Sequence, residues 1–125
     1  MYVKHYPDKI VIENPGGFLE GITEKNIITH PSVPRNKLIA ETLQRLKYVQ
    51  RTGQGVDIIF REMVSMGKPY PVYRVFSDAV QLTIASATEY IDFVKFIVKE
   101  QDTKQISLSL SELMIMRYVT DNRQI

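Results

Sequence analysis

The sequence contains no cysteine and only two histidines among its 125 residues. Without cysteine the chain cannot form disulfides, thiolate nucleophiles or cysteine-ligated zinc sites, and the absence favours a cytoplasmic location. The sequence also lacks an uninterrupted run of about 18 apolar residues, so no membrane span is predicted. The first ten residues, MYVKHYPDKI, lack the continuous apolar core of a secretory signal. We therefore expect a cytoplasmic protein without a membrane contact.

The composition is that of a folded protein, because 44% of the residues are hydrophobic. The length fits one domain with a short appendage. The net charge of +2 is too small to indicate nucleic-acid binding by itself. One region is more basic, with five cations against the single anion Glu41: Arg35, Lys37, Arg45, Lys47 and Arg51. This cluster is either a solvated helix face or an edge that faces phosphates.

The N-terminal third predicts two paired strands followed by loops. Lys9–Glu13 is rich in β-branched residues, and Tyr2–Tyr6 is the nearest partner for it. A two-stranded sheet is marginal alone, so we expect further sequence upstream of Met1 in the natural protein. A turn at Asn14–Gly17 ends the strand, and Thr23 is positioned to cap a short helix over residues 24–29.

Two helices and a hairpin are predicted next. Asn36 is a good N-cap for a helix over residues 37–50, whose apolar side carries Ile39, Leu43 and Leu46. A second helix begins at about Val56 and ends before Gly67, with Ile59, Phe60, Met63 and Val64 as its buried stripe. Residues 72–76 and 79–84 then predict a hairpin that turns at Ser77-Asp78.

The C-terminal third changes to a helical pattern. Ser86–Glu89 and Ser109–Glu112 both fit the capping box, in which a serine and a glutamate three residues later satisfy the first amides of a helix. Each is predicted to begin one helix. The elements together predict an α+β two-layer fold, with helices on one face of a partial sheet and a helical C-terminal extension.

Two glycine loops carry the only candidate chemistry. ENPGG, with Asn14, Gly16 and Gly17, follows a strand, and RTGQG, residues 51–55, precedes a helix. Glycine lets backbone N–H groups approach a phosphate, and a helix N-terminus adds free amides and a positive dipole end. Arg35, Lys37 and Arg51 are positioned to add charge-assisted hydrogen bonds. The plainer interpretation is a turn and a helix connection.

These loops carry a family resemblance. The stretches IENPGGFLEGIT, PRNKLIAETLQRL and QRTGQGVDIIFREM resemble the C-terminal domain of RecG-related transcriptional regulators, which are described as ATP-dependent DNA helicase-like. That domain is a divergent member of the GHKL, or Bergerat, ATPase group. The resemblance covers residues 8–86 in order. It implies a GHKL-like sheet and an ATP or ADP site that uses Mg in the full-length protein.

The resemblance implies roles for particular residues. Asn14, Gly16 and Gly17 match the first glycine box, which lies under the adenine, and residues 18–35 match the lid segment. The second glycine box, beside the phosphates, matches Thr52, Gly53, Gln54 and Gly55, with Arg35 and Arg51 as the accompanying cations. The chain departs from the family where an aspartate usually meets the adenine, since it reads Glu13-Asn14. The helix that bears the magnesium-binding asparagine and the general-base glutamate is expected upstream of Met1, so no catalytic residue is assigned.

The resemblance also suggests a division into two parts. Residues 1–86 would be the C-terminal part of the GHKL-like domain, and residues 87–125 a helical extension that could begin a winged-helix domain. Residues 87–125 carry five cations and six anions, which does not support a DNA-binding surface, so two ordinary packing helices are the preferred interpretation.

Three functions follow from these patterns. The first is a fragment of a transcriptional regulator that contacts DNA through the full-length protein and has a vestigial or retained nucleotide site. The second is an ATP-binding module that is active only with the upstream helix. The third is a dimerisation module, because an open sheet edge favours a homodimer. No metal site is predicted, since His5 and His30 lie far apart in sequence without a third ligand.

Overall fold

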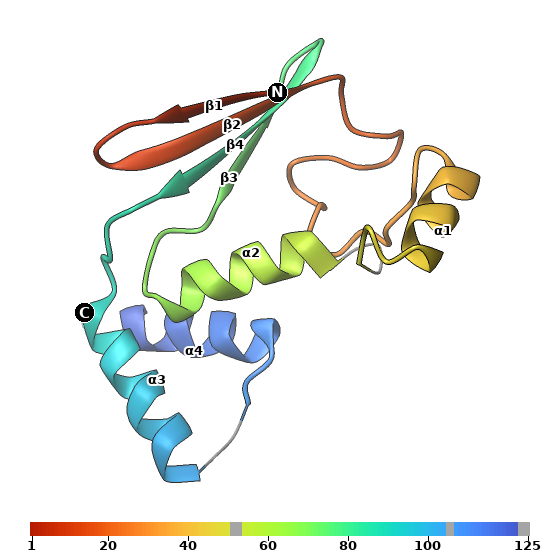
Figure 1. Ribbon diagram of the computed structural model, residues 1–125. Helices are drawn as coiled ribbons and strands as arrows, with labels where there is room; N and C mark the ends of the chain where they lie inside the picture. The colour runs from red at the N-terminus through yellow and green to blue at the C-terminus, as the bar shows by residue number, and fades with distance from the viewer. Residues whose placement is uncertain (51–53, 105–106, 123–125) are drawn as a thin grey trace.

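The protein is described from a computed structural model, which covers residues 1–50, 54–104 and 107–122. Four strands and four helices form an α+β fold with a helical C-terminal part. Figure 1 shows the sheet above helix α2 (Gln54–Ser65), with helices α3 (Ile91–Lys104) and α4 (Leu110–Asn122) beneath it. The predicted fold class is confirmed.

The sheet is antiparallel throughout, with the strand order β1-β2-β4-β3. Its strands are β1 (Tyr2–His5), β2 (Lys9–Pro15), β3 (Val72–Val75) and β4 (Ala79–Ala85). Tyr2–His5 pairs with β2 as expected, and the predicted hairpin turns at Ser77-Asp78, where the Phe76 amide donates to the Ala79 carbonyl at 2.8 Å. The outer edge of β3 is occupied by Glu24, whose carboxylate accepts a hydrogen bond from the Val75 amide.

The main hydrophobic core lies between α2, α3 and α4 and not under the sheet. Val64, Phe93, Ile97 and Leu113 form one buried cluster. The predicted stripe on α2 is confirmed for Phe60, Met63 and Val64, which are buried, while Ile59 is half-buried. Val64 of α2 therefore packs on α3 and α4. One turn earlier, Phe60 contacts Tyr70, which precedes β3, and Tyr73 of β3.

Only one of the two predicted capping boxes is present. The Ser109 amide donates to Glu112 Oε2 at 2.8 Å, and the Glu112 amide donates to Ser109 Oγ at 3.3 Å. The hydrogen bonds that the Ser109 amide and hydroxyl donate to the Glu112 carboxylate hold the pKa of this carboxyl below its ordinary value. The box predicted at Ser86–Glu89 is wrong. α3 begins at Ile91, and the amides of Glu89 and Tyr90 both donate to the Gly67 carbonyl, each at 2.9 Å.

The helix predicted over residues 24–29 is also wrong, because those residues form turns. Thr23 and Asn26 exchange side-chain and backbone hydrogen bonds, which satisfy their amides without a helix. The proline at position 31 disfavours helical backbone at His30, so the turn does not propagate.

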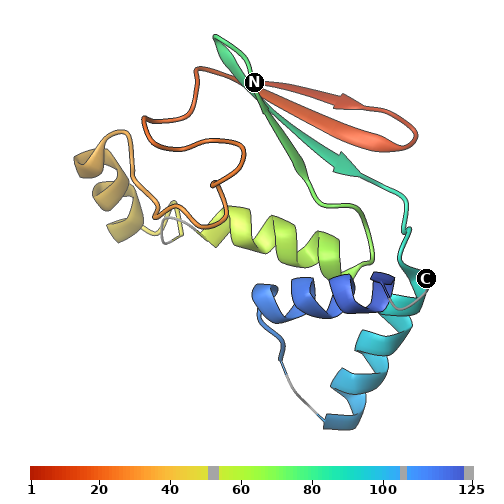
Figure 2. The ribbon, with the colours of Figure 1, turned by 180° about the vertical axis from the view of Figure 1, so that it is seen from behind.

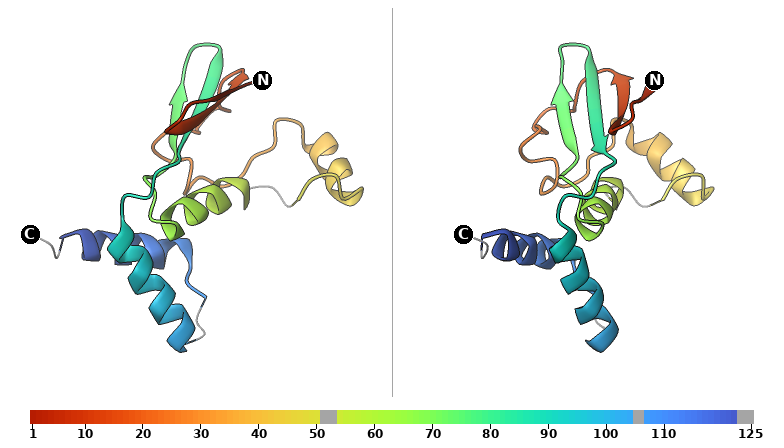
Figure 3. Two further views of the ribbon diagram at one scale, coloured as in Figure 1. Left: turned by 60° about the vertical axis from the view of Figure 1, so that its left-hand side comes forward. Right: turned by 90° about the vertical axis from the view of Figure 1, so that its left-hand side faces the viewer.

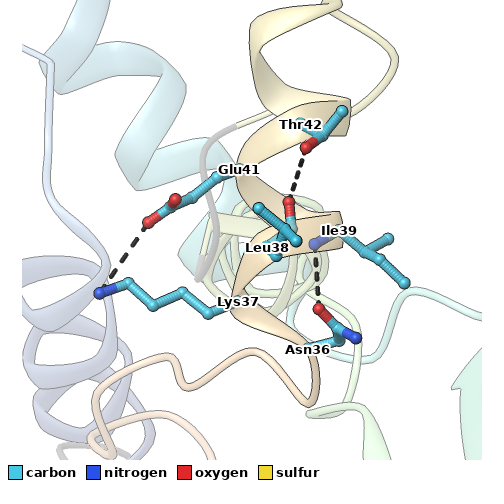
Figure 4. Close-up of polar contacts among 6 residues, drawn as sticks. All are labelled: Asn36, Lys37, Leu38, Ile39, Glu41 and Thr42. Atoms are coloured by element: carbon cyan, nitrogen blue, oxygen red, sulfur yellow. Dashed lines mark hydrogen bonds and ion pairs between the residues drawn. The ribbon is translucent and has the colours of Figure 1, made fainter.

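Helix α1 (Lys37–Arg45) is shorter than the predicted span of residues 37–50. Figure 4 shows its start, where Asn36 Oδ1 accepts the Ile39 amide at 3.0 Å as predicted. The helix ends in a Schellman motif. Tyr48 N donates to Leu43 O and Lys47 N to Gln44 O, with Lys47 in the left-handed region at φ 60°.

Helix α1 also stands away from the core. All nine of its residues are exposed or half-buried, and Leu38 is 74% exposed. Figures 2 and 3 show it projecting beyond the N-terminal end of α2, on the far side from α3 and α4. Of the apolar side predicted for this helix, Ile39 and Leu46 are exposed and Leu43 is half-buried.

We expect Leu113→Ala to lower the free energy of unfolding by roughly 2–5 kcal/mol, because a fully buried leucine leaves a cavity when truncated. Leu113 is 1% exposed and lies in the shared core. Ile115→Ala on the same helix is the control, since Ile115 is 64% exposed. Urea denaturation of both variants measures the difference. Equal losses would show that the core does not hold α4 in place.

Candidate functional site

The first glycine loop lies at the end of β2, where the strand leaves the sheet. Asn14 is exposed and still pairs with Val80, so the turn itself begins after Pro15. Gly16 has a φ of +88°, which favours glycine, and its amide donates to the Asp78 carbonyl at 2.7 Å. This amide is thus engaged within the sheet. A Cβ at Gly17 would meet no atom within 4 Å, so that peptide lies beside open space.

The second glycine loop lies at the start of α2. Gln54 and Gly55 form the first turn of the helix, whose leading amides have no partner inside the helix. A Cβ added at Gly55 would also meet nothing within 4 Å. The other predicted residues of this loop, Arg51, Thr52 and Gly53, lie outside the described residues.

The segment between β2 and α1, which we call the linking segment, runs from the first loop toward the second in space (Figure 1). Figures 1 and 2 show it descending from the sheet to the N-terminal end of α2. A cavity of about 440 Å³ lies between this segment and the helix. Phe18, which follows Gly17, and Val56, which follows Gly55, both line it. The residues that follow the two glycine loops therefore share one cavity.

The walls of this cavity are mainly apolar, with a few polar groups. Four branched aliphatic residues of the linking segment contribute, namely Ile22, Ile27, Ile28 and Val33. His30 and Asp57 add an imidazole and a carboxylate, and His30 Nδ1 lies 2.7 Å from the Pro31 carbonyl. An apolar pocket with a few polar groups is the usual form of a small-molecule site.

Arg35 closes the linking segment at its base. Its Nη2 donates to the Gly17 carbonyl at 3.0 Å, which joins the two ends of the segment. Of the other predicted cations, Lys37 contacts Glu41 at 4.0 Å, an exposed i,i+4 pair that contributes little to stability. The structure thus brings Arg35 to the first glycine loop, whereas Lys37 faces along α1 (Figure 4).

Aromatic stacking fixes the segment against the sheet. The Tyr73 ring stacks on Phe60 of α2 at 6.3 Å between centroids and lies equally far from Phe18. Burial raises the pKa of the Tyr73 hydroxyl, which therefore stays neutral at physiological pH. One wall of the cavity is thereby tied to both the sheet and α2.

Sequence reasoning missed several residues of the cavity. From the sequence, Asp57 is interpreted as a cap or surface charge and His30 as a loop histidine. Neither has a second acidic, basic or metal-binding residue at a spacing typical of a functional site. The available signal was the apolar content of residues 18–33. These residues contain four isoleucine or valine side chains, and the prolines at positions 31 and 34 prevent a long helix, so the side chains are expected to pack locally.

The described residues hold no group of three or more histidine, aspartate or glutamate side chains that could bind a metal ion. None of the helices, over the residues that the structure covers, has the length and apolar content to cross a membrane.

The family described as "Putative ATP-dependent DNA helicase recG C-terminal" matches residues 1–84. The chain belongs to this family. The resemblance to GHKL-type ATPase folds agrees with that membership. The matched residues include both glycine loops and all residues that line the cavity.

A solved structure has the same fold. The DIP2311 protein from Corynebacterium diphtheriae superposes with a TM-score of 0.62 at 22% sequence identity. The match covers 72% of this chain and 19% of that chain, so this chain spans about a fifth of the larger protein. No curated protein sequence matches the chain.

The hydrogen bond from Arg35 to Gly17 predicts a measurable effect on the linking segment. Arg35→Ala should speed hydrogen exchange at the hydrogen-bonded amides of Gly16 and Ile22 by several-fold, because it removes the contact that closes the segment. Arg45→Ala removes the same charge from exposed α1 and is the control. Unchanged exchange in Arg35→Ala would mean that the aromatic contacts alone hold the segment.

Proposed function

We propose that this recG C-terminal domain binds an adenine nucleotide in the cavity between the linking segment and the N-terminus of α2. The observation that carries the proposal is the shared cavity, lined at one end by Phe18 beside Gly17 and at the other by Val56 beside Gly55. Its apolar walls suit a base. The unobstructed backbone at Gly55 suits phosphate oxygens.

The proposed roles follow the family resemblance. Asn14, Gly16 and Gly17 lie on the side of the base, although the Gly16 amide already serves Asp78. Thr52, Gly53, Gln54 and Gly55 surround the phosphates, with Arg35 and Arg51 as counter-charges. The proposal concerns binding and not hydrolysis, because the resemblance assigns the magnesium-binding asparagine and the general base to a helix that precedes the matching residues.

In the longer protein, the nucleotide site would belong to a DNA-associated transcriptional regulator. The family's helicase-related description supports a DNA partner. Residues 87–125 would connect the nucleotide-binding part, residues 1–86, to a winged-helix domain. α3 and α4 share a core with α2, which would let a change at the nucleotide site reach the DNA-binding part through packed helices.

A thermal-shift assay with millimolar ATP or ADP, with and without Mg²⁺, tests nucleotide binding. Nucleotide at about 100 times its dissociation constant should stabilise the fold by roughly 2.7 kcal/mol. Gly55→Leu should abolish the shift and leave the unliganded melting temperature close to that of the natural sequence, because its side chain enters open space.

Ser111→Leu is the matched control, because Ser111 occupies the same second position in α4 that Gly55 occupies in α2. It should keep the nucleotide-dependent shift. If the natural sequence shows no shift with either nucleotide, the site is vestigial in this chain.

A homodimer is a second proposal, and the exposed apolar side of α1 favours it. Ile39 and Leu46 are both more than half exposed, although an amphipathic helix usually buries such residues. Sedimentation velocity should therefore detect a dimer at high protein concentration. Ile39→Glu with Leu46→Glu should shift the population to monomer, whereas Gln44→Glu should not. A monomer at every concentration would exclude this surface as a dimer interface.

A further inference from the structure

The two faces of the sheet differ in chemistry. Successive strand residues point to opposite faces, so the pairing register assigns each side chain to one of them. Tyr73, which stacks on Phe60, marks the face toward the helices. That face also carries Ile12, Leu82 and Ile84. The opposite face, which we call the outer face, carries Val72 and Arg74 and is polar and basic.

The register arranges the outer face in rows across the strands. Tyr2, Glu13, Gln81 and Arg74 form one row, and Lys4, Val11, Thr83 and Val72 form the next. Tyr6 and Lys9 lie beyond, at the β1–β2 turn, where Lys9 Nζ is 5.3 Å from the centre of the Tyr6 ring. A shallow cavity of about 270 Å³ opens on this face over Val11, Val72 and Thr83.

Positive charge lies at the borders of this cavity. Lys4 and Lys9 lie at one side and Arg74 at the other, and all three line it. The four strands span about 14 Å at the usual spacing of about 4.8 Å between neighbours, so Lys4 on β1 and Arg74 on β3 are held well apart. Within the described part of the chain none of the three forms an ion pair.

Negative charge on the outer face is limited and already engaged. Glu13 accepts a hydrogen bond from Gln81 Nε2 at 3.3 Å and is half-buried. Asp8 and Asp78 lie in the turns at the two ends of the sheet. Lys4, Lys9 and Arg74 thus lie around an apolar floor, formed by the side chains of Val11 and Val72. The one carboxylate that the described strands place on this face, Glu13, does not line the cavity. This surface is therefore complementary to an anionic partner.

Aromatic rings complete the pattern. Tyr2 is 69% exposed and Tyr6 is 42% exposed, and both belong to the strand and turn that border the cavity. Tyrosine rings offer stacking surfaces to unpaired bases, while lysine and arginine contact the phosphates between them. A duplex hides its base faces within the stack, so the apolar floor and the tyrosines favour a single strand.

We propose that the outer face of the sheet binds single-stranded nucleic acid, with Lys4, Lys9 and Arg74 on phosphates and Tyr6 against a base. This surface is separate from the cavity at the N-terminus of α2. Val72 lines the outer face, whereas the next residue, Tyr73, points to the other face, where it contacts Phe18 of the cavity wall. The proposal therefore goes beyond nucleotide binding and does not depend on it.

Fluorescence anisotropy of a labelled 15-nucleotide oligothymidine, titrated with the whole chain, tests the proposal. The logarithm of the association constant should fall with the logarithm of salt concentration with a slope of about −2, since three neutralised phosphates contribute about −0.7 each. The triple variant Lys4→Gln, Lys9→Gln and Arg74→Gln should weaken binding at least tenfold. Circular dichroism of each variant confirms that it is folded.

Two further variants separate the parts of the surface. Arg61→Gln, Lys95→Gln and Lys99→Gln remove the same charge from exposed positions elsewhere and should leave affinity within about twofold. Tyr6→Leu should weaken binding roughly tenfold without changing the salt slope, because stacking releases no counterions.

Four outcomes would overturn the proposal: no binding at low salt, equal losses in both triple variants, tighter binding to the duplex of the same length, or equal competition by polyglutamate. The nucleotide thermal shift is measured without oligothymidine. Failure of one proposal is therefore distinguishable from failure of the other.

Discussion

The arrangement of the helices depends on the turn that follows α2. Gly67 lies at a φ of +65°, and a Cβ there would come within 2.5 Å of Val94 Cγ2 and 2.8 Å of the Tyr90 carbonyl oxygen. The next residue, Lys68, accepts a hydrogen bond from the Arg117 guanidinium at 2.6 Å through its carbonyl. One tight turn thus receives the start of α3 and the middle of α4. Only glycine allows the approach, so its identity there is fixed by space and by backbone conformation.

Arg117 is a buried charged residue that binds the backbone of this turn beside an apolar core. The residue is 4% exposed, and its guanidinium lies 3.7 Å from the centre of the Tyr90 ring and 4.5 Å from that of Tyr70. Cation–π contacts and a backbone carbonyl stabilise the buried charge. Tyr70 leads into β3 and also contacts Phe60, so the sheet, α2 and α4 are connected through one side chain. The division of the chain between residues 86 and 87 remains a prediction. Residues on both sides of this boundary contribute to one core.

The sequence was informative wherever a local pattern and its partner lay close together. The β3–β4 hairpin, the stripe on α2 and the box at Ser109 all depend on residues within a few positions of one another. Tertiary contacts decided the rest. The Ser86 amide donates to the Asp8 carbonyl and the Glu89 amide to the Gly67 carbonyl, so the two donors of the predicted Ser86 box are satisfied without it. Ile39 and Leu46 stay exposed although the sequence places them on an apolar side. At the site, glycine motifs identified the two loops, but no spacing pattern could place Asp57 or His30 beside Phe18. Those contacts exist only because the linking segment folds back to α2.

Glu24 makes the two edges of the sheet unequal in their ability to pair with a further strand. Its carboxylate already satisfies the outward amide of Val75, so a strand arriving beside β3 would have to displace a charged acceptor before it could pair. The opposite margin, β1, ends the sheet with four exposed residues and needs no such displacement. An additional strand, whether from the same polypeptide or another, would therefore join more readily at β1, away from the linking segment and its cavity.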